Sequence, residues 1–251
     1  MNSNPFSLQD RTVLVTGASS GIGRSVAVEC HKLGGTIIPV GRNEARLRQT
    51  LSLMDRTDLP APNGDLTDDA YRTELVRGLP PLQGVVLNAG IMRIMTLRNM
   101  TDSIIEELFD VNVFSQIKLL RELFQQRKIQ RGTSIVFTTS ISGSVIGSKG
   151  NGLYTATKAA LTGMAKSLAL DYARKGIRCN CVAPGMVDTS GVTGTYELIS
   201  EQGVQEDRNR YPLGDYGRPE DVAYAVIYLL SPASRWVTGT VLTLDGGFTA
   251  Q

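Results

Sequence analysis

The sequence contains a single histidine, His31, and only three cysteines among its 251 residues. One histidine cannot build a metal-ligand cluster, and a histidine-based catalytic triad would depend on it alone. The cysteines, Cys30, Cys179 and Cys181, are odd in number and lack the paired spacing of a zinc site or a disulfide framework. We therefore interpret them as reduced core thiols and expect no metal site.

An excess of charge and a long apolar run are also missing. Lysine and arginine number 26 against 24 aspartates and glutamates, a balance that gives no electrostatic reason to expect nucleic acid. No stretch approaches the roughly 18 apolar residues of a membrane span, and residues 1–10 have neither the basic start nor the apolar core of a signal peptide. These absences predict a soluble, cytoplasmic protein with no membrane or nucleic-acid partner.

The sequence does contain a regular alternation of short apolar runs with longer helical patterns, which is typical of a parallel sheet. Strands are expected at 12–16, 36–40, 85–87, 134–138, 177–182 and 241–244, with a weaker one at 59–63. Helices are expected at 21–33, 44–54, 68–77, 101–130, 154–174 and 219–230. No linker interrupts the pattern, so we predict one doubly wound α/β domain over residues 1–251.

Two segments depart from this alternation. Residues 1–10 are expected to form an N-terminal tail before the first strand. Residues 190–211 are long and polar and break the strand-helix order late in the chain. An insertion of this kind beside strand ends is typical of a loop that covers a substrate.

A glycine-rich turn joins the first strand to the first helix in the segment TGASSGIG, residues 16–23. Its glycines permit a tight turn and let backbone N–H groups approach a pyrophosphate, whose charge the helix N-terminus favours. The spacing is Gly-x-x-x-Gly-x-Gly, because Val26 stands where a strict G-x-G-x-x-G motif would end. A glycine cluster can be a plain turn, but this position in the chain favours a nucleotide site.

Four polar residues could carry chemistry. Tyr154 and Lys158 are four apart on one helix face, and an ammonium lowers the pKa of a phenol, which prepares it for proton exchange with a carbonyl or alcohol. Ser140 follows a strand at the carboxyl edge of the sheet, where open α/β folds bind ligands. Asn112 lies on an apolar helix stripe, where an amide needs partners. Each of them alone could equally be an ordinary structural residue.

Together these motifs resemble the single-domain short-chain dehydrogenase/reductases, and in particular the 3-oxoacyl-(acyl-carrier-protein) reductases. The glycine turn, Asn88-Ala89-Gly90, Asn112, Ser140, Tyr154-x-x-x-Lys158 and Pro184-Gly185 follow the family's order over nearly the whole chain. The resemblance implies a Rossmann-like, doubly wound parallel sheet of about seven strands with helices on both faces. It also implies a nicotinamide dinucleotide and carbonyl/alcohol redox chemistry.

The resemblance assigns catalytic roles to Asn112, Ser140, Tyr154 and Lys158. Tyr154 would be the acid/base, and Lys158 would lower its pKa and bind the cofactor ribose. Ser140 would orient the substrate oxygen, whereas Asn112 would hold a water that relays protons through Lys158. Ser142 competes with Ser140, which we prefer because the family's pattern is serine, two residues and then glycine.

The expected cofactor is NADP(H) rather than NAD(H). A carboxylate about 20 residues beyond the glycine turn is typical of NAD sites, but here a glycine occupies that position and Arg42 follows. An arginine suits the additional phosphate of NADP, although it could also be a solvated helix start. The expected cofactor-binding residues are Gly17, Ser19, Ser20, Gly21, Ile22, Gly23, Arg42, Asp65, Leu66, Asn88, Ala89, Gly90, Tyr154, Lys158, Pro184, Gly185, Val187 and Thr189.

The leading hypothesis is an NADP(H)-dependent oxidoreductase that interconverts a carbonyl and a secondary alcohol. A 3-oxoacyl thioester is a candidate substrate, because Arg131, Arg174 and Lys175 lie where the resembling reductases dock an acidic carrier; arginines at helix ends also complement the helix dipole. Apolar and small residues on two helices predict a homodimer or homotetramer. The alternative function is a non-catalytic nucleotide-binding sensor or scaffold of the same fold.

Overall fold

The computed structural model describes residues 4–56, 62–189 and 201–251, which are built around one parallel sheet. Its strands lie in the order β2-β1-β3-β4-β5-β6, and every neighbouring pair is parallel. They are β1 (Thr12–Thr16), β2 (Thr36–Val40), β3 (Leu82–Leu87), β4 (Ile129–Thr138), β5 (Arg178–Pro184) and β6 (Val241–Leu244). The strand order reverses at β1, and in such sheets ligands bind at that point, beyond the carboxyl ends of the strands.

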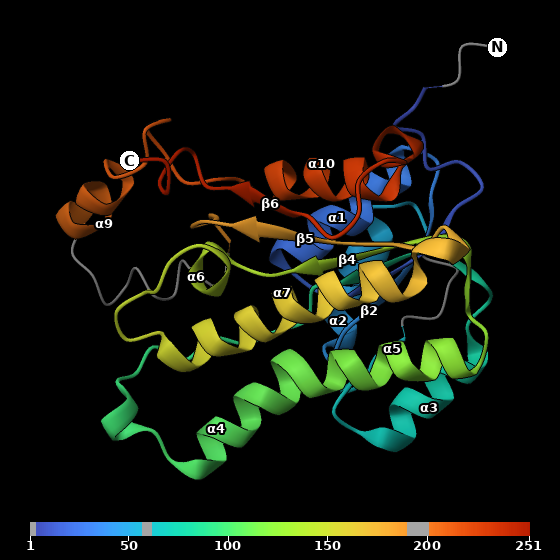
Figure 1. Ribbon diagram of the computed structural model, residues 1–251, viewed down its shortest axis with the longest axis horizontal. Helices are drawn as coiled ribbons and strands as arrows, with labels where there is room; N and C mark the ends of the chain where they lie inside the picture. The colour runs from blue at the N-terminus through green and yellow to red at the C-terminus, as the bar shows by residue number, and fades with distance from the viewer. Residues whose placement is uncertain (1–3, 57–61, 190–200) are drawn as a thin grey trace.

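Helices cover both faces of the sheet (Figure 1). They are α1 (Gly21–Lys32), α2 (Glu44–Ser52), α3 (Asp69–Gly78), α4 (Asp102–Phe109), α5 (Ser115–Gln125), α6 (Ile141–Ser144), α7 (Gly152–Tyr172), α9 (Glu201–Arg208) and α10 (Pro219–Leu230). α1, α2 and α10 pack on one face, and α3, α5 and α7 pack on the other. In the described part of the chain no helix is long and apolar enough to cross a membrane. The predicted Rossmann-like, doubly wound α/β fold is confirmed.

β1 is buried on both faces because its successive side chains enter different cores. Val13 and Val15 of β1 join the core beneath α1 and α10, whereas Leu14 joins the core beneath α5 and α7. β1 itself is packed from both faces and ends at Thr16, directly before the ligand crevice.

A polar cap sets where α3 begins: the Asp68 carboxylate accepts hydrogen bonds from the backbone N–H groups of Ala70 and Tyr71.

The single helix predicted at 101–130 is wrong. The structure has α4 and α5 joined by a π-helical turn at Asp110–Phe114, and α5 ends at Gln125. Arg127 then adopts a left-handed φ of 56°, which no helix continues through, and β4 begins at Ile129 rather than at the predicted residue 134. Apolar spacing alone does not reveal the additional residue of a π-turn, because the stripe continues across it.

Six strands are described where about seven were expected. The weak strand predicted at 59–63 falls largely on residues 57–61, which lie outside the described residues. Asn63 forms one parallel bridge with Gly41, at the end of β2. Pro39 is accommodated in β2, which forms the edge of the described sheet, where a missing backbone donor is tolerated.

The predicted tail at residues 1–10 is partly packed. Leu8 is fully buried, and its backbone N–H donates to the Leu33 carbonyl after α1, with an N–O distance of 2.9 Å. Its side chain belongs to the same core as Val13 and Val15. The chain is therefore anchored before the first strand begins.

Phe137 in β4 is fully buried in the core beneath α5 and α7. Phe137→Ala is expected to lower the free energy of unfolding by about 3–5 kcal/mol, because the truncation leaves a cavity. Leu97, which is 78% exposed, provides the control: Leu97→Ala should change it by less than about 0.5 kcal/mol. Urea denaturation monitored by circular dichroism measures both, and equal stabilities of the two variants would contradict this packing.

Candidate active site

A cavity of about 610 Å³ lies at the carboxyl ends of β1, β2 and β3. The expected cofactor-binding residues in its wall are Gly17, Ser19, Ser20, Gly21, Ile22, Arg42, Asp65, Leu66, Asn88, Ala89, Gly90 and Thr189. Those that lie outside the wall are Gly23, Tyr154, Lys158, Pro184, Gly185 and Val187. Wall residues that were not expected are Gly41, Asn43, Arg46, Gly64, Thr67, Ile91, Val111 and Ser115. The cavity therefore brings together five separate loop segments and one helical segment at Val111 and Ser115.

The glycine turn packs so closely on its surroundings that no side chain fits at two positions. Gly17 has a φ of 66°, and a Cβ there would lie 2.9 Å from the Ala89 Cα. A Cβ on Gly23 would lie 2.3 Å from the Gly17 carbonyl oxygen. Ser20 precedes α1 without a side-chain capping bond, and the first turn holds no acidic residue. The helix N-terminus thus offers N–H groups to an anion, and these residues fit a dinucleotide pyrophosphate.

Thr16, the last residue of β1, holds this arrangement together and was not predicted as a site residue. Its hydroxyl donates to the Val86 carbonyl at 3.2 Å and accepts from the backbone N–H groups of Asn88 and Ala89 at 2.9 and 3.1 Å. The Asn88 amide in turn donates to the Thr16 carbonyl at 3.2 Å. A hydroxyl at the end of a buried strand, directly before the glycine turn, was the signal available in the sequence.

The rim of the cavity beyond β2 is basic. An Arg42 Nη1 lies 3.6 Å from an Asp65 carboxylate oxygen, and Arg46 also lines the cavity from the first turn of α2. Burial acts to raise the pKa of Asp65, but hydrogen bonds from Thr67 at 2.8 and 2.9 Å and the charge of Arg42 lower it overall. Asp65 is consequently held ionised beside Arg42, and both residues are exposed enough to meet a ligand.

Ser140 and Tyr154 are brought together at the end of β4. The Ser140 hydroxyl lies beside the Tyr154 phenol and accepts from the Ser142 N–H at 3.1 Å, whereas the Ser142 hydroxyl pairs with that of Ser148 at 2.6 Å. The structure thus places Ser140 rather than Ser142 beside the phenol. Burial raises the pKa of Tyr154, and the hydrogen bond with Ser140 only partly opposes this. In the protein without cofactor the pKa of Tyr154 is therefore raised overall, and its lowering by Lys158 stays a prediction.

Lys158 lies one helical turn beyond Tyr154, with its Nζ 5.6 Å from the centre of the phenol ring. Its side chain is buried, and Nζ donates to the Thr138 carbonyl at 2.8 Å. Burial lowers the pKa of Lys158 to about 8. A Cβ on Gly90 would lie 3.5 Å from this Nζ and 3.2 Å from the Asn112 Oδ1, so Lys158 and Asn112 lie directly behind a residue of the cavity wall. Tyr154 lies beside Lys158 and Ser140 lies beside Tyr154, so the four predicted catalytic residues are neighbours.

Asn112 lies in the π-helical turn and is completely buried. Its amide nitrogen donates to the Ile91 carbonyl at 2.9 Å and to the Thr157 hydroxyl at 3.1 Å, and its Oδ1 accepts from the Ile91 N–H at 2.8 Å. Gln116, another residue that was not predicted, donates to the carbonyls of Asn112 and Ala89 at 2.9 and 2.7 Å. Asn112 therefore ties the loop after β3 to α7, and its role with a relay water stays a prediction.

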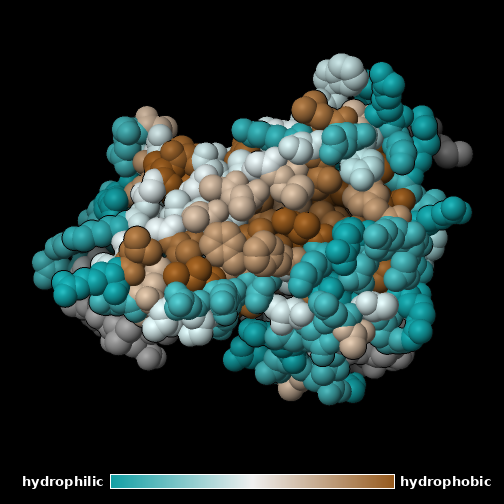
Figure 2. Space-filling view, turned by 60° about the horizontal axis from the view of Figure 1, so that its bottom comes forward, coloured by the Kyte–Doolittle hydropathy of each residue, from teal (hydrophilic) through white to brown (hydrophobic). Residues whose placement is uncertain are grey.

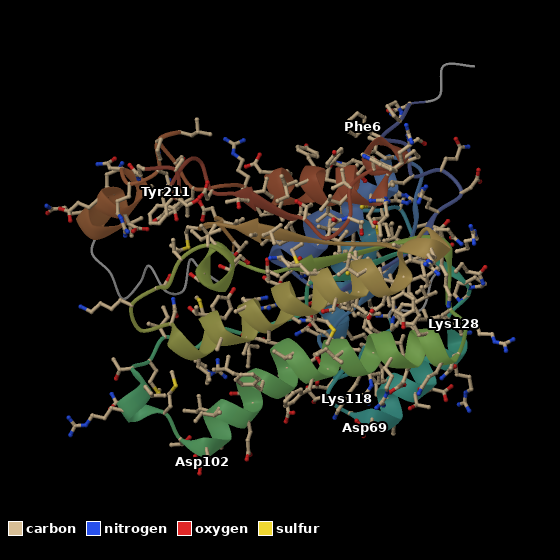
Figure 3. All side chains as sticks on the ribbon, viewed as in Figure 1. Phe6, Asp69, Asp102, Lys118, Lys128 and Tyr211 are labelled. Atoms are coloured by element: carbon tan, nitrogen blue, oxygen red, sulfur yellow. The ribbon has the colours of Figure 1, made fainter. Side chains whose placement is uncertain are left out.

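The segment after β5 turns back toward the glycine turn. The N–H of Gly185 donates to the Leu244 carbonyl at 2.9 Å, and the N–H of Met186 donates to the Tyr211 hydroxyl at 3.1 Å. Tyr211, near α9 in Figure 3, was not predicted as an anchor of this segment. A Cβ on Gly21 would lie 3.3 Å from the Thr189 methyl group, so the segment ends against the start of α1. The rest of the predicted 190–211 insertion up to residue 200 lies outside the described residues.

Lys158→Met tests the cost of the buried charge. In the wild-type protein the pKa of Lys158 is about 8, against 10.5 ordinarily. The ammonium therefore destabilises the fold fully below pH 8, and this destabilisation disappears as the pH rises toward 10.5. We expect Lys158→Met to raise the free energy of unfolding at pH 7 by on the order of 2 kcal/mol. The difference from wild type should shrink between pH 8 and 10.5.

Urea denaturation of the ligand-free protein across this pH range measures the effect. The exposed Lys166, on the same helix, is the matched control, and Lys166→Met should show no such pH-dependent gain. A lower stability of Lys158→Met at pH 7 would show that the charge is not a cost to folding.

Comparison with known proteins identifies the family. The family model described as Enoyl-(Acyl carrier protein) reductase matches residues 17–249. The 3-oxoacyl-(acyl-carrier-protein) reductase FabG of Rickettsia bellii is 36% identical over 241 residues, which cover 96% of this chain and 97% of that protein. The acetoacetyl-CoA reductase of a Synechocystis strain is 34% identical over 245 residues, covering 95% and 96%.

Solved structures agree with these relatives. A Beutenbergia cavernae protein that was proposed to be an NAD(P)-dependent gluconate 5-dehydrogenase, with NADP bound at low occupancy, superposes with a TM-score of 0.89 at 28% identity. The match covers 99% of this chain and 100% of that one. The chain therefore belongs to the short-chain dehydrogenase/reductase family of NAD(P)-dependent oxidoreductases.

Proposed function

We propose that the chain uses NADP(H) to interconvert a carbonyl and a secondary alcohol, with a 3-oxoacyl thioester as the carbonyl substrate. The observation that carries this proposal is the placement of Ser140 and Tyr154 beside the buried Lys158, which lies next to the cavity wall at Gly90. The two similar reductases support the substrate class, because acetoacetyl-CoA is itself a 3-oxoacyl thioester. The glycine turn and the open helix N-terminus support dinucleotide binding.

In the proposed reaction, bound NADPH supplies a hydride to the carbonyl carbon. Tyr154 donates its phenolic proton to the carbonyl oxygen, and the Ser140 hydroxyl orients that oxygen by a hydrogen bond. A raised pKa keeps the phenol protonated until the substrate arrives, which suits a proton donor. With a pKa of about 8, Lys158 remains largely protonated at neutral pH, and its charge stabilises the phenolate that forms.

The preference for NADP over NAD rests on the basic rim. Arg42 and Arg46 both line the cavity beyond β2, and Gly41 stands where a carboxylate would bind the ribose hydroxyls of NAD. The planar guanidinium of Arg42 can bond a phosphate in bidentate fashion. Asp65 already lies beside Arg42, so binding of a 2′-phosphate would draw Arg42 from that carboxylate.

We propose assembly as a homodimer or homotetramer through α4, α5 and α7. Leu170 of α7 is 81% exposed and Phe114, between α4 and α5, is 47% exposed. Figure 2 looks onto this side of the molecule and shows apolar side chains gathered across its centre. A second copy would remove this apolar surface from water.

The basic residues predicted to dock an acidic carrier lie far from the reacting groups. Arg131 is near the start of β4, whereas Ser140 follows the end of the same strand. The two residues therefore lie at opposite ends of the parallel strands. Arg174 and Lys175 join Arg131 there, because Gly176 lies next to Gly132. Carrier docking on this patch and a cytoplasmic location both stay predictions.

Tyr154→Phe tests the reaction. We expect it to lower kcat by about 10²–10⁴-fold because the proton donor is lost, while NADPH still binds. NADPH oxidation should be measured with 3-oxoacyl thioesters, enoyl thioesters, aldohexoses, gluconate-type sugar acids and simple ketones. Full turnover by Tyr154→Phe would refute the assignment, and a wild-type protein that binds NADPH but oxidises it with no member of the panel would favour a sensor or scaffold.

Arg42→Ala tests the cofactor preference. The variant should raise the KM for NADPH by about tenfold or more and leave the KM for NADH nearly unchanged, because only NADPH carries the 2′-phosphate. Arg48→Ala is the matched control, since Arg48 lies on α2 in an exposed ion pair with Glu44 and outside the cavity wall. Equal losses for the two cofactors would overturn the preference.

A further inference from the structure

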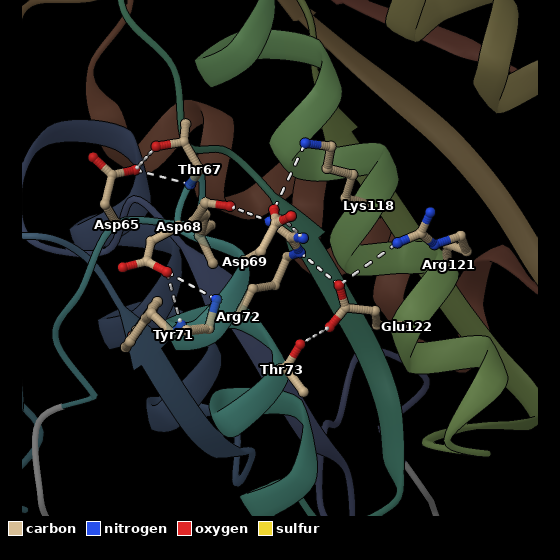
Figure 4. A network of polar contacts seen from close by, with 12 residues as sticks. Asp65, Thr67, Asp68, Asp69, Tyr71, Arg72, Thr73, Lys118, Arg121 and Glu122 are labelled. Carbon is tan, nitrogen blue, oxygen red and sulfur yellow. Dashed lines mark hydrogen bonds and ion pairs between the residues drawn. The ribbon is translucent and has the colours of Figure 1, made fainter.

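A buried arginine, Arg72, lies behind the cavity wall at Leu66 and belongs to the network of polar contacts in Figure 4. Asp65 of the same wall segment lies beside Arg42, so under the proposed function this part of the wall would meet the adenosine half of NADP(H), which carries the 2′-phosphate.

Arg72, in the first turns of α3, is 1% exposed, and its guanidinium uses all three of its nitrogens. Nε donates to the Glu122 carboxylate of α5 at 2.8 Å, and Nη2 donates to Asp69 at 2.7 Å. Nη1 donates to the backbone carbonyl of Leu66 at 2.9 Å. The side chain thus connects two helices to one wall residue of the cavity.

The acid that orients this arginine is also buried. Glu122 is 6% exposed, and its second oxygen accepts from the Thr73 hydroxyl at 3.3 Å. Around it, Lys118 lies 3.7 Å from Asp69, and Arg121 lies 3.9 Å from Glu122. The carboxylate of Glu122 is therefore held from α3 and α5 together, and it fixes the plane of the Arg72 guanidinium.

Fold stability alone does not call for such a pair. Desolvating two charges is expensive, and apolar residues of similar volume often stabilise a protein as well or better. The distinguishing contact is that with Leu66, because the backbone there belongs to the segment Asp65–Thr67 that lines the cavity. Leu66 is nearly buried, and its neighbour Thr67 fixes the Asp65 carboxylate. The guanidinium thus acts on the backbone that presents Asp65 and Leu66 to a ligand.

We infer that Arg72 is a positioning residue for the adenine end of the cofactor, and that Glu122 orients it. The inference rests on the proposed NADP(H) function, since it concerns the same cavity. Arg72 touches no part of the cavity wall except through Leu66 and contacts none of the reacting residues. Its loss should therefore weaken recognition of the adenosine half and leave proton transfer by Tyr154 intact.

The test replaces the pair by apolar side chains of similar length in Arg72→Met/Glu122→Met, which leaves no unpaired buried charge. We expect the KM for NADPH and the inhibition constant of 2′,5′-ADP, which carries only the adenosine half, to rise together by about five- to tenfold. The kcat at saturating NADPH should stay within about twofold of wild type, because the reacting groups are untouched. Steady-state kinetics and a urea denaturation curve provide the measurements.

Arg72→Lys supplies the second variant, because it keeps the charge opposite Glu122 but lacks the fork that reaches both Glu122 and Leu66. It should show the same joint rise of KM and inhibition constant. Arg77→Met, on the same helix in an exposed ion pair with Glu74, is the control and should change neither.

Three results decide between the explanations. An unchanged inhibition constant for 2′,5′-ADP in a folded Arg72 variant overturns the inference. A lower kcat with an unchanged inhibition constant also overturns it, since that pattern indicates general damage. Failure of the wild-type protein to bind NADPH or 2′,5′-ADP would refute the proposed function itself.

Discussion

The buried ammonium of Lys158 is the constraint on which the site depends. It is 4% exposed, and among the described residues no carboxylate forms a salt bridge with it; the Thr138 carbonyl is its hydrogen-bond partner. An unneutralised cation at this depth is costly, so the surrounding structure must hold it firmly. β4 supplies the carbonyl, α7 supplies the lysine, and the π-helical turn with Asn112 closes the third side. A bound ligand whose oxygen atoms accept hydrogen bonds from Nζ would compensate this charge.

Arg72 and Lys158 are both buried cations, but the surrounding acceptors compensate their charges to different degrees. Arg72 is surrounded by acceptors, two of them carboxylates, and its pKa is raised despite burial, which alone would lower it. Lys158 has one carbonyl, and burial lowers its pKa to about 8. A paired charge is fixed in one state and suits a structural task, whereas a poorly paired one can exchange protons near neutral pH. Arg72 therefore suits a structural role, whereas Lys158, which lies beside Tyr154, suits proton exchange.

The alternation of strands and helices along the chain and the position of the glycine turn could be predicted from the sequence, because they follow from local periodicity and from motifs within one loop. The direction of the Tyr154 pKa shift could not, since burial by segments far along the chain decides it. Thr16 and Gln116 were missed for a related reason: each meets its partners only after β1, β3 and the helix after β3 have come together. The π-helical turn was not predicted, because the apolar spacing continues through it.

The link between β1 and β3 also bears on the order of folding. β1 and β2 pair across one short helix, but the Thr16 hydroxyl meets the backbone of Asn88 across 72 residues of chain. Contacts that close so long a loop form late, because chain entropy must be lost before they contribute. The crevice is therefore completed only near the end of folding, after the local β1-α1-β2 unit exists. A dinucleotide bound there would act on the last step and slow the protein's unfolding more than it hastens its folding.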